Sequence, residues 1–249
     1  RLFRNTMAIQ ERRTEVIYYD CTNFYFEIEE AEDDKQFGVS KENRPLPIVE
    51  MGLFMDRDGI PLAFCINPGN ESEQLSLIPL EKKLMEKFDM SQFIVCTDAG
   101  LSSNTNRCFN SYGKADATRD FITTQSVKKL KAHLKKWALA PEGWRLSGSD
   151  GRTTYNVDEL DEAECLDRIY YKSRWIKEKV EVTIDGQSRK VELEQQLIVT
   201  YSIKYRNYLR SIRNRQVERA RKAVAAGAKA VERKRQNDPK RFIKVNHAT

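Results

Sequence analysis

The sequence has no long hydrophobic run, few cysteines and only 2 histidines. No apolar run approaches the roughly 18 residues that a membrane-spanning helix needs. The first residues mix charged and apolar side chains, so we expect no signal peptide. The 5 cysteines are odd in number, and no two of them have the spacing of a zinc knuckle. These absences favour a cytoplasmic protein with reduced thiols over a disulfide framework, a zinc site or a membrane protein.

Several common catalytic motifs are also missing. The sequence contains no phosphate-binding P-loop, no glycine-rich dinucleotide motif, no HExxH zinc motif and no GxSxG nucleophile motif. The two histidines, His133 and His247, lie in basic segments, and neither is flanked by a plausible nucleophile. Carboxylates therefore remain as the main candidates for chemistry.

Charge is divided unevenly along the chain. The 249 residues contain 43 Lys and Arg against 37 Asp and Glu, which gives a net charge of +6. Residues 1–127 carry a net charge of −7, residues 128–249 carry +13, and residues 204–249 hold 15 basic and 3 acidic side chains. A basic segment of this kind favours contact with a polyanion such as nucleic acid, because each neutralised phosphate releases counterions. The alternative is a solvated helix face.

Hydrophobic periodicity predicts a mixed α/β fold. The apolar share of 40% excludes a fully disordered chain. Alternation and short apolar runs predict strands, and Asp58-Gly59 predicts a hairpin turn between the second and third of them. The expected strands are 15–29, 48–56, 60–66, 93–97 and 121–125. The expected helices are one ending near Phe88, one over 104–111 and one over 127–138. The first helix has Asn70 and Glu73 as a capping box, and Pro79 would delay its regular part to about Ser76.

The second half of the chain looks like an appendage to this α/β sheet. Residues 141–167 are polar and loop-like, 168–203 are β-rich with a turn at Asp185-Gly186, and 204–235 form a long basic helix. We therefore predict three parts: residues 1–139 as the first part of a catalytic core, 140–203 as a β-rich insertion, and 204–249 as a basic helical segment.

Two aspartates stand out as candidate catalytic residues. The even positions of the 15–29 strand carry most of its large apolar side chains, so alternation places Asp20 on the apolar face. A carboxylate is costly there unless it is paired or bound to metal. Asp98 follows the 93–97 strand, at the strand end where α/β sheets bind ligands. If these strands are neighbours, both carboxylates can hold Mg²⁺, which prefers oxygen ligands. The alternative is that each merely bonds nearby backbone amides.

Five sequence blocks, taken in order, resemble DDE transposases of bacterial insertion sequences, in the insertion-sequence-four-like group. Residues 20–27 (DCTNFYFE) resemble the motif of the first aspartate, and residues 97–103 (TDAGLSS) resemble that of the second. Between them lie the blocks 38–45 (GVSKENRP), 49–53 (VEMGL) and 68–73 (PGNESE). The resemblance covers residues 15–128, and a weaker one runs from Leu197 to Ala220.

The resemblance implies a ribonuclease-H-like core and a Mg²⁺-dependent reaction, for which Mn²⁺ could substitute. In that reaction water cleaves the transposon end, and the freed 3′-hydroxyl attacks target DNA. Asp20 and Asp98 would be catalytic residues and metal ligands. The implied partners are DNA, as transposon ends and target, and a second copy of the chain in the active complex. A nuclease or resolvase of the same fold and a non-catalytic DNA-binding protein remain as alternative functions.

The third acidic residue of the family pattern has no clear match. Tyr171 to Glu178 resembles the start of that pattern, but Asp185 stands seven residues after Glu178 where the family has Lys. The segment also reads as strand and hairpin instead of helix. We therefore interpret Glu178 as a look-alike, and expect the third acid beyond Thr249 and the family's end-binding region before Arg1. A chain without the third acid is expected to bind metal poorly.

Overall fold

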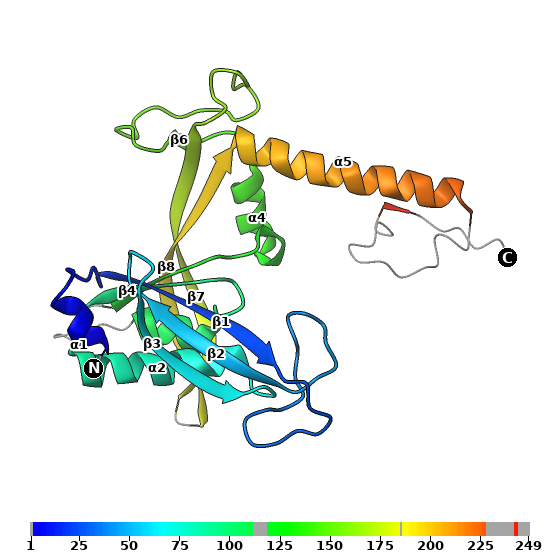
Figure 1. Ribbon diagram of the computed structural model, residues 1–249. Helices are drawn as coiled ribbons and strands as arrows, with labels where there is room; N and C mark the ends of the chain where they lie inside the picture. Colours follow the sequence, from blue (N-terminus) through cyan, green and yellow to red (C-terminus); the bar gives the residue numbers. More distant parts are fainter. Residues whose placement is uncertain (1, 112–118, 185, 228–241, 244–249) are drawn as a thin grey trace. The chain divides into compact units, whose positions relative to one another are not determined.

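The computed structural model describes residues 2–111, 119–184, 186–227 and 242–243 (Figure 1). The chain divides into two compact units. Unit 1 comprises residues 1–135 and 175–195, and unit 2 comprises residues 136–174 and 196–249. The units alternate along the sequence because the outer part of one long hairpin belongs to unit 1 and its two ends belong to unit 2.

Unit 1 contains a five-stranded mixed sheet in the order β3-β2-β1-β4-β5. Its strands are β1 (Val16–Tyr25), β2 (Ile48–Met55), β3 (Pro61–Pro68), β4 (Phe93–Thr97) and β5 (Arg119–Thr123). β2 pairs antiparallel with β1 and β3, whereas β1–β4 and β4–β5 are parallel. Only β2 therefore runs against the others, which is the arrangement of a ribonuclease-H-like sheet. The predicted mixed α/β fold class is confirmed.

The β2–β3 hairpin forms at the turn that the sequence predicts. Gly59 adopts φ +78°, a left-handed conformation that costs a glycine little. Asp56 organises the turn, because its Oδ1 accepts hydrogen bonds from the amides of Asp58 and Ile60. Its Oδ2 pairs with Arg12 Nε at 2.5 Å, and both side chains are almost fully buried. This buried ion pair ties the segment before β1 to the hairpin.

Two helices, α2 (Glu73–Phe88) and α3 (Asn104–Ser111), cover one face of the sheet. α2 begins at Glu73, and Ser72 at its N-cap makes no capping hydrogen bond. The expected capping box at Asn70 and the expected delay to Ser76 are therefore wrong, and the helix continues through Pro79. Packing overrides these local signals, since α2 buries one side against the sheet. The buried α2 residues in this core are Leu77, Leu80 and Leu84.

Several other boundaries differ from the sequence-based expectation. β1 ends at Tyr25 instead of residue 29, and β5 begins two residues early at Arg119. The single helix expected over 127–138 is two elements, the 3₁₀ turn η1 (Val127–Lys129) and the helix α4 (Ala132–Leu139). Leu130 between them has an extended ψ of 148°, which ends the first turn. The short helix α1 (Leu2–Met7) packs on α2 through Phe3 and Phe88.

A long hairpin, β7 (Ile169–Ile184) and β8 (Gln187–Ser202), supplies the predicted β-rich segment. Gly186 in its turn has φ +77°, while Asp185 lies outside the described residues. Within unit 1, Val180, Val182 and Leu193 of the hairpin pack with Cys108 of α3. The outer hairpin thus extends the apolar core past α3.

Unit 2 has its own small core, formed by Trp144, Val157, Cys165, Tyr170 and Ile203. The two-residue strand β6 (Arg145–Leu146) pairs with β7. Lys172 is buried beside this core, where its Nζ donates to the carbonyl of Ala140 at 2.7 Å and lies 4.5 Å from the Trp144 ring centroid. Burial lowers the pKa of Lys172.

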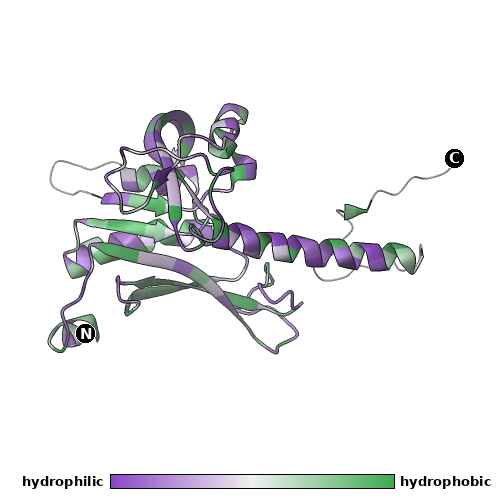
Figure 2. Ribbon diagram, turned by 90° about the horizontal axis from the view of Figure 1, so that it is seen from above, coloured by the Kyte–Doolittle hydropathy of each residue, from purple (hydrophilic) through white to green (hydrophobic). Residues whose placement is uncertain are grey.

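The basic helix α5 (Ile203–Ala225) continues from the end of β8 in unit 2 (Figure 1). Ser202 caps it by accepting a hydrogen bond from the Tyr205 amide. The predicted helix over 204–235 is confirmed up to Ala225, where it ends with Ala226 as C-cap and Gly227 at φ +89°. Residues 228–235 lie outside the described residues. Figure 2 shows hydrophilic residues along most of its length. No helix among the described residues is both long and apolar enough to cross a membrane.

A buried carboxyl group on α2 makes no ion pair with any residue that the structure describes. Glu81 is fully buried, and its Oε2 accepts a hydrogen bond from Asn110 Nδ2 at 3.1 Å. Glu81 Oε1 and Asn110 Oδ1 are both buried acceptors without a hydrogen bond in the described part of the chain. Burial raises the pKa of Glu81 from 4.5 to about 7. A proton on Glu81 removes the buried charge, so the folded state favours the neutral acid.

The raised pKa of Glu81 predicts that the free energy of unfolding falls as the pH rises. The folded state binds a proton on Glu81 more tightly than the unfolded chain does. This proton therefore adds to the free energy of unfolding in full below pH 4.5, and the added stability is lost as the pH rises through about 7. We expect Glu81→Gln to stabilise the protein at pH 8 by on the order of 2–3 kcal/mol, with little gain at pH 4. Urea unfolding at both pH values measures this, with Glu86→Gln on the exposed side of α2 as the control. Equal effects of Glu81→Gln at both pH values would contradict a titrating Glu81.

Candidate active site

The packed face of β1 is the opposite of the expected one. Ile17, Tyr19 and Cys21 are buried against the helices, and the even positions face away from them. Asp20 is therefore exposed, and its predicted place on the buried apolar side is wrong. The large apolar side chains that suggested the other face include Phe26 and Ile28, which lie beyond the end of β1. Asp20 thus needs neither a partner nor a metal to be tolerated.

The pairing of β1 with β4 brings the strand that carries Asp20 next to the strand that Asp98 follows. The strands are parallel neighbours, with Val16 opposite Ile94 and Tyr18 opposite Cys96. The recorded pairs end there, and β4 itself ends at Thr97, one residue before Asp98. The same offset, extended by two residues, would place Asp98 beside Asp20. Alternation, extended by one residue past the end of β4, would also put both side chains on the same side of the sheet. Adjacent strands lie about 4.8 Å apart, so the two backbones approach closely at this level.

Each aspartate uses one carboxylate oxygen in a local hydrogen bond. Asp20 Oδ1 accepts from the amide of Cys21 at 2.8 Å. Asp98 Oδ1 accepts from the amides of Gly100 and Leu101, at 2.8 and 3.2 Å, and so closes the turn after β4. No hydrogen bond to either Oδ2 and no ion pair with either carboxylate occurs in the part of the chain that the structure describes. Each side chain thus keeps one oxygen available to a ligand.

The side of the sheet that carries Asp20 and Asp98 is apolar and open within unit 1. Across the strands, Asp20 lies beside Leu53 of β2, which lies beside Phe64 of β3. Phe64 is 65% exposed, and the same side includes Tyr18 and Ile122, which are 41% and 58% exposed. Two exposed carboxylates on an apolar surface are well placed to attract a cation, since no basic side chain pairs with them in the described ranges.

The described residues do not complete a metal site. Within residues 2–111, 119–184, 186–227 and 242–243, no three His, Cys, Asp or Glu side chains gather closely enough to hold a metal ion. Glu178 lies on a strand, β7, and its carboxylate pairs with Lys131 at 2.8 Å and accepts from Gln195 at 3.2 Å. The reading of its segment as strand and hairpin is confirmed, and the location of the third acid stays a prediction.

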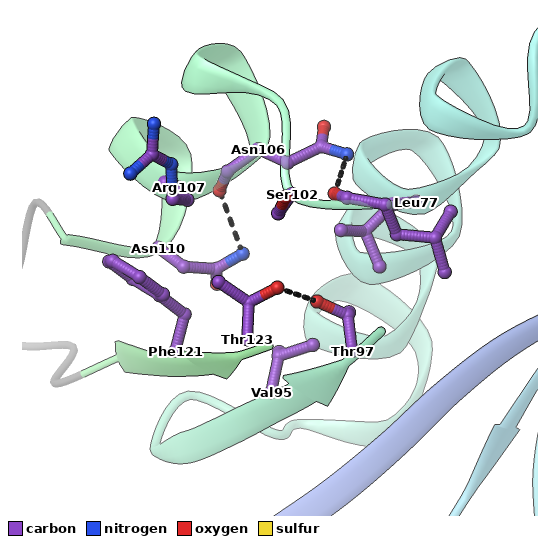
Figure 3. A pocket seen from close by; sticks show the side chains of 10 residues that line it. Leu77, Val95, Thr97, Ser102, Asn106, Arg107, Asn110, Phe121 and Thr123 are labelled. Carbon is purple, nitrogen blue, oxygen red and sulfur yellow. Dashed lines mark hydrogen bonds between the residues drawn. The ribbon is translucent and has the colours of Figure 1, made fainter. Parts of the chain in front are cut away.

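A small pocket lies on the helix-covered side of the same strands, between α3 and the ends of β4 and β5 (Figure 3). Thr97 and Thr123 line its floor and share a hydrogen bond of 3.1 Å. Thr123 Oγ1 also donates to the backbone carbonyl of Asp98 at 3.0 Å. The pocket has room for little more than a water molecule. The hydrogen bond from Thr123 ties the turn of Asp98 to β5.

A second charged cluster lies on the helix-facing side, and sequence reasoning gave it no role. Lys41 Nζ lies 3.3 Å from Glu73 Oε1 and donates to the carbonyl of Cys21. Glu50 is buried nearby, and burial together with Glu73 raises its pKa to about 7, against the opposing effect of Lys41. Its spacing from Gly52 and Phe54 on β2 was the signal that could have placed it on the buried face. This cluster contacts β1 on the helix-facing side, through the hydrogen bond from Lys41 to the Cys21 carbonyl.

Comparisons with known proteins add little to this geometry. The sequence matches no family model and no curated protein. A solved structure to which the chain is similar is a Mos1 transposase paired-end complex with the left transposon end. That match has a TM-score of 0.27 and 17% sequence identity, and it covers 42% of this chain and 34% of the transposase chain.

The hydrogen bonds that Asp98 accepts predict that replacing it with alanine destabilises the protein more than replacing it with asparagine. Alanine removes the acceptor for the amides of Gly100 and Leu101, so Asp98→Ala should lower the free energy of unfolding by about 1 kcal/mol. Asparagine keeps an Oδ1 acceptor, so Asp98→Asn should stay within about 0.5 kcal/mol of the parent protein. Denaturant unfolding at constant pH measures both. If both variants are as stable as the parent, the side chain does not close this turn.

Proposed function

We propose that this chain is a DDE transposase catalytic domain, of the insertion-sequence-four-like group, in which Asp20 and Asp98 hold the divalent cations. The observation that supports this proposal best is the parallel pairing of β1 with β4 in a sheet of ribonuclease-H-like strand order. Its register, extended by two residues, would set the exposed Asp20 and Asp98 level with each other. Aspartates with a free oxygen and no basic partner are suited to hard cations such as Mg²⁺. The expected substrates are transposon ends and target DNA.

The donor set suits a hard divalent cation in part. Asp20 Oδ2 and Asp98 Oδ2 are the two oxygens that would hold it, while each Oδ1 stays bonded to backbone amides. A Mg²⁺ ion bound there would polarise the phosphodiester and stabilise the attacking and leaving oxygens. The turn after β4 holds Asp98 through hydrogen bonds to its backbone carbonyl and to its Oδ1. A third carboxylate ligand remains a prediction.

The basic helix α5 is the proposed DNA contact. It contains eight Lys and Arg residues and a single acidic residue, Glu218. Arg213, Arg215 and Arg219 are exposed, and none of them pairs with a carboxylate among the residues whose placement is described. Unpaired guanidinium groups on a solvent-exposed helix are available to neutralise phosphates. Binding of this kind depends on charge and not on base sequence.

The two alternative functions are a nuclease or resolvase and a non-catalytic DNA-binding protein, and activity assays distinguish them from a transposase. A nuclease or resolvase of the same fold would cleave DNA at the same aspartates, but only a transposase joins the freed 3′ end to a second DNA. A non-catalytic DNA-binding protein is favoured by one observation, namely that the described residues supply no third ligand. In that case α5 would retain its role, and substitution of the aspartates would leave every activity intact.

The paired aspartates predict a shared cation site. Asp20→Asn and Asp98→Asn should each weaken Mn²⁺ binding about tenfold or more, because each removes one anionic ligand. Both variants should also abolish any Mn²⁺- or Mg²⁺-dependent nicking of DNA. Calorimetric titration of the protein with Mn²⁺ measures the affinity directly. Asparagine keeps the local hydrogen bonds, so the loss would not reflect unfolding.

Asp120 provides a matched control for this experiment. It is an exposed carboxylate on the same side of the sheet, and it lies beside Ile94, four residues before Asp98. That separation is about 13 Å along the strand, too far to share a cation with Asp98. Asp120→Asn should leave Mn²⁺ affinity unchanged. Binding that falls equally in all three variants, or in none, would show that Asp20 and Asp98 form no specific site.

The role of α5 is tested by reversing its charge. The triple variant Arg213→Glu, Arg215→Glu and Arg219→Glu should weaken DNA binding and reduce the slope of log affinity against log salt by about one for each phosphate that is no longer neutralised. Fluorescence anisotropy at several salt concentrations provides both quantities. The control is the same charge change on the exposed lysines of α2, Lys82, Lys83 and Lys87. Equal losses in both variants would mean that only total charge matters.

A further inference from the structure

Two tyrosines near the start of α5 are exposed side by side. Tyr205 and Tyr208 are 61% and 56% exposed, and their rings are stacked with centroids 6.2 Å apart and planes at 29°. Leu209 beside them is 47% exposed. Large aromatic side chains gain by leaving water, and a preformed stacked pair costs little further entropy to order. The pair therefore offers a flat apolar surface to a binding partner.

The first turn of α5 is anchored to unit 2 through other residues. Ile203 is fully buried in the unit 2 core, and Asn207, one turn later, donates to Glu162 Oε1 at 2.5 Å. Arg206 also pairs with Glu162, at 2.8 Å. Ile203 and Asn207 mark the side of the helix that faces the unit 2 core. With 3.6 residues per turn, Tyr205 lies about 180° and Tyr208 about 120° around the axis from the middle of that side, so both project away from it.

The charge around the tyrosines identifies the partner. α5 has eight basic residues against one acidic residue, so a second copy of the same helix would be repelled and a polyanion would be attracted. Tyr208, Arg215 and Arg219 follow the spacing i, i+7 and i+11, which is one side of a helix. Arg215 lies about 10 Å along the axis from Tyr208. An aromatic surface followed by free guanidinium groups fits a base and the phosphates of the nucleotides next to it.

We propose that Tyr205 and Tyr208 form a stacking platform for an unpaired base, so that α5 binds single-stranded nucleic acid, with Arg215 and Arg219 on its phosphates. Bases inside a duplex are stacked on one another and cannot offer a free face, whereas an unpaired base can. The proposal rests on the proposed nucleic-acid contact of α5 and adds a preference for unpaired strands. It does not depend on the aspartates of unit 1.

The test compares three probes with one set of variants of the full chain. The probes are a short oligothymidine, an oligouridine of the same length and a blunt duplex, and anisotropy gives each affinity. The double variant Tyr205→Ala and Tyr208→Ala should bind single strands about tenfold or more weakly and the duplex less than about twofold more weakly. Tyr205→Phe with Tyr208→Phe keeps both rings and should bind single strands like the parent. Leu209→Ala removes an exposed apolar side chain without a ring and should have no effect.

Each outcome decides the proposal. A tenfold loss for both single strands, with rescue by phenylalanine, supports stacking on any unpaired base, and a loss with only one strand supports it for that type of nucleic acid. Unchanged single-strand affinity in the alanine variant overturns it, and so does an equal loss for the duplex. Altered oligomeric mass with unchanged nucleic-acid affinity would make the pair a protein contact instead. If the triple variant of Arg213, Arg215 and Arg219 loses nucleic-acid binding and the tyrosine variants do not, the result supports the phosphate contact and rejects the stacking.

Discussion

The parallel pairing of β1 with β4 is the constraint on which the rest of the site depends. It fixes which residues of two strands, 78 positions apart in sequence, stand at the same level. Register matters because a shift of one residue would move Asp98 to the other side of the sheet from Asp20. Packing opposes such a shift, since Ile17 and Tyr19 of β1 and Phe93 and Val95 of β4 are all buried in one core. The core of unit 1 therefore fixes the register of the strands that lead to the two aspartates.

The two sides of the sheet divide structural and chemical roles. On the helix side, α2 and α3 cover the core, and the polar groups there serve the fold: Glu81 bonds Asn110, and Lys41 pairs with Glu73. On the other side, Asp20 and Asp98 keep oxygens free of hydrogen bonds with the described residues. Both aspartates also make the local bonds expected of ordinary turn and strand residues. Both are exposed, so their free oxygens and not burial distinguish them.

Much of this architecture could be predicted from the sequence, because local signals and packing agreed there. Asp58-Gly59 predicted the β2–β3 turn, and the run 93–97 predicted β4 with Asp98 at its end. The prediction failed for the packed face of β1, since alternation shows two faces but not which of them the helices cover. It also failed at the start of α2, where core packing overrides Pro79. The register of β1 with β4 could not be predicted, because it depends on pairing between distant segments.

The claim that Asp20 and Asp98 share one cation is tested most directly by a crystal structure of the protein soaked with Mn²⁺, with the ion located by its anomalous scattering. The account predicts one strong peak with an oxygen of each aspartate about 2.1–2.2 Å away. A peak bound by only one of them, or located elsewhere while both carboxylates keep only their backbone hydrogen bonds, would contradict it. The sheet would then carry two structural aspartates, and the function of the protein would rest on α5.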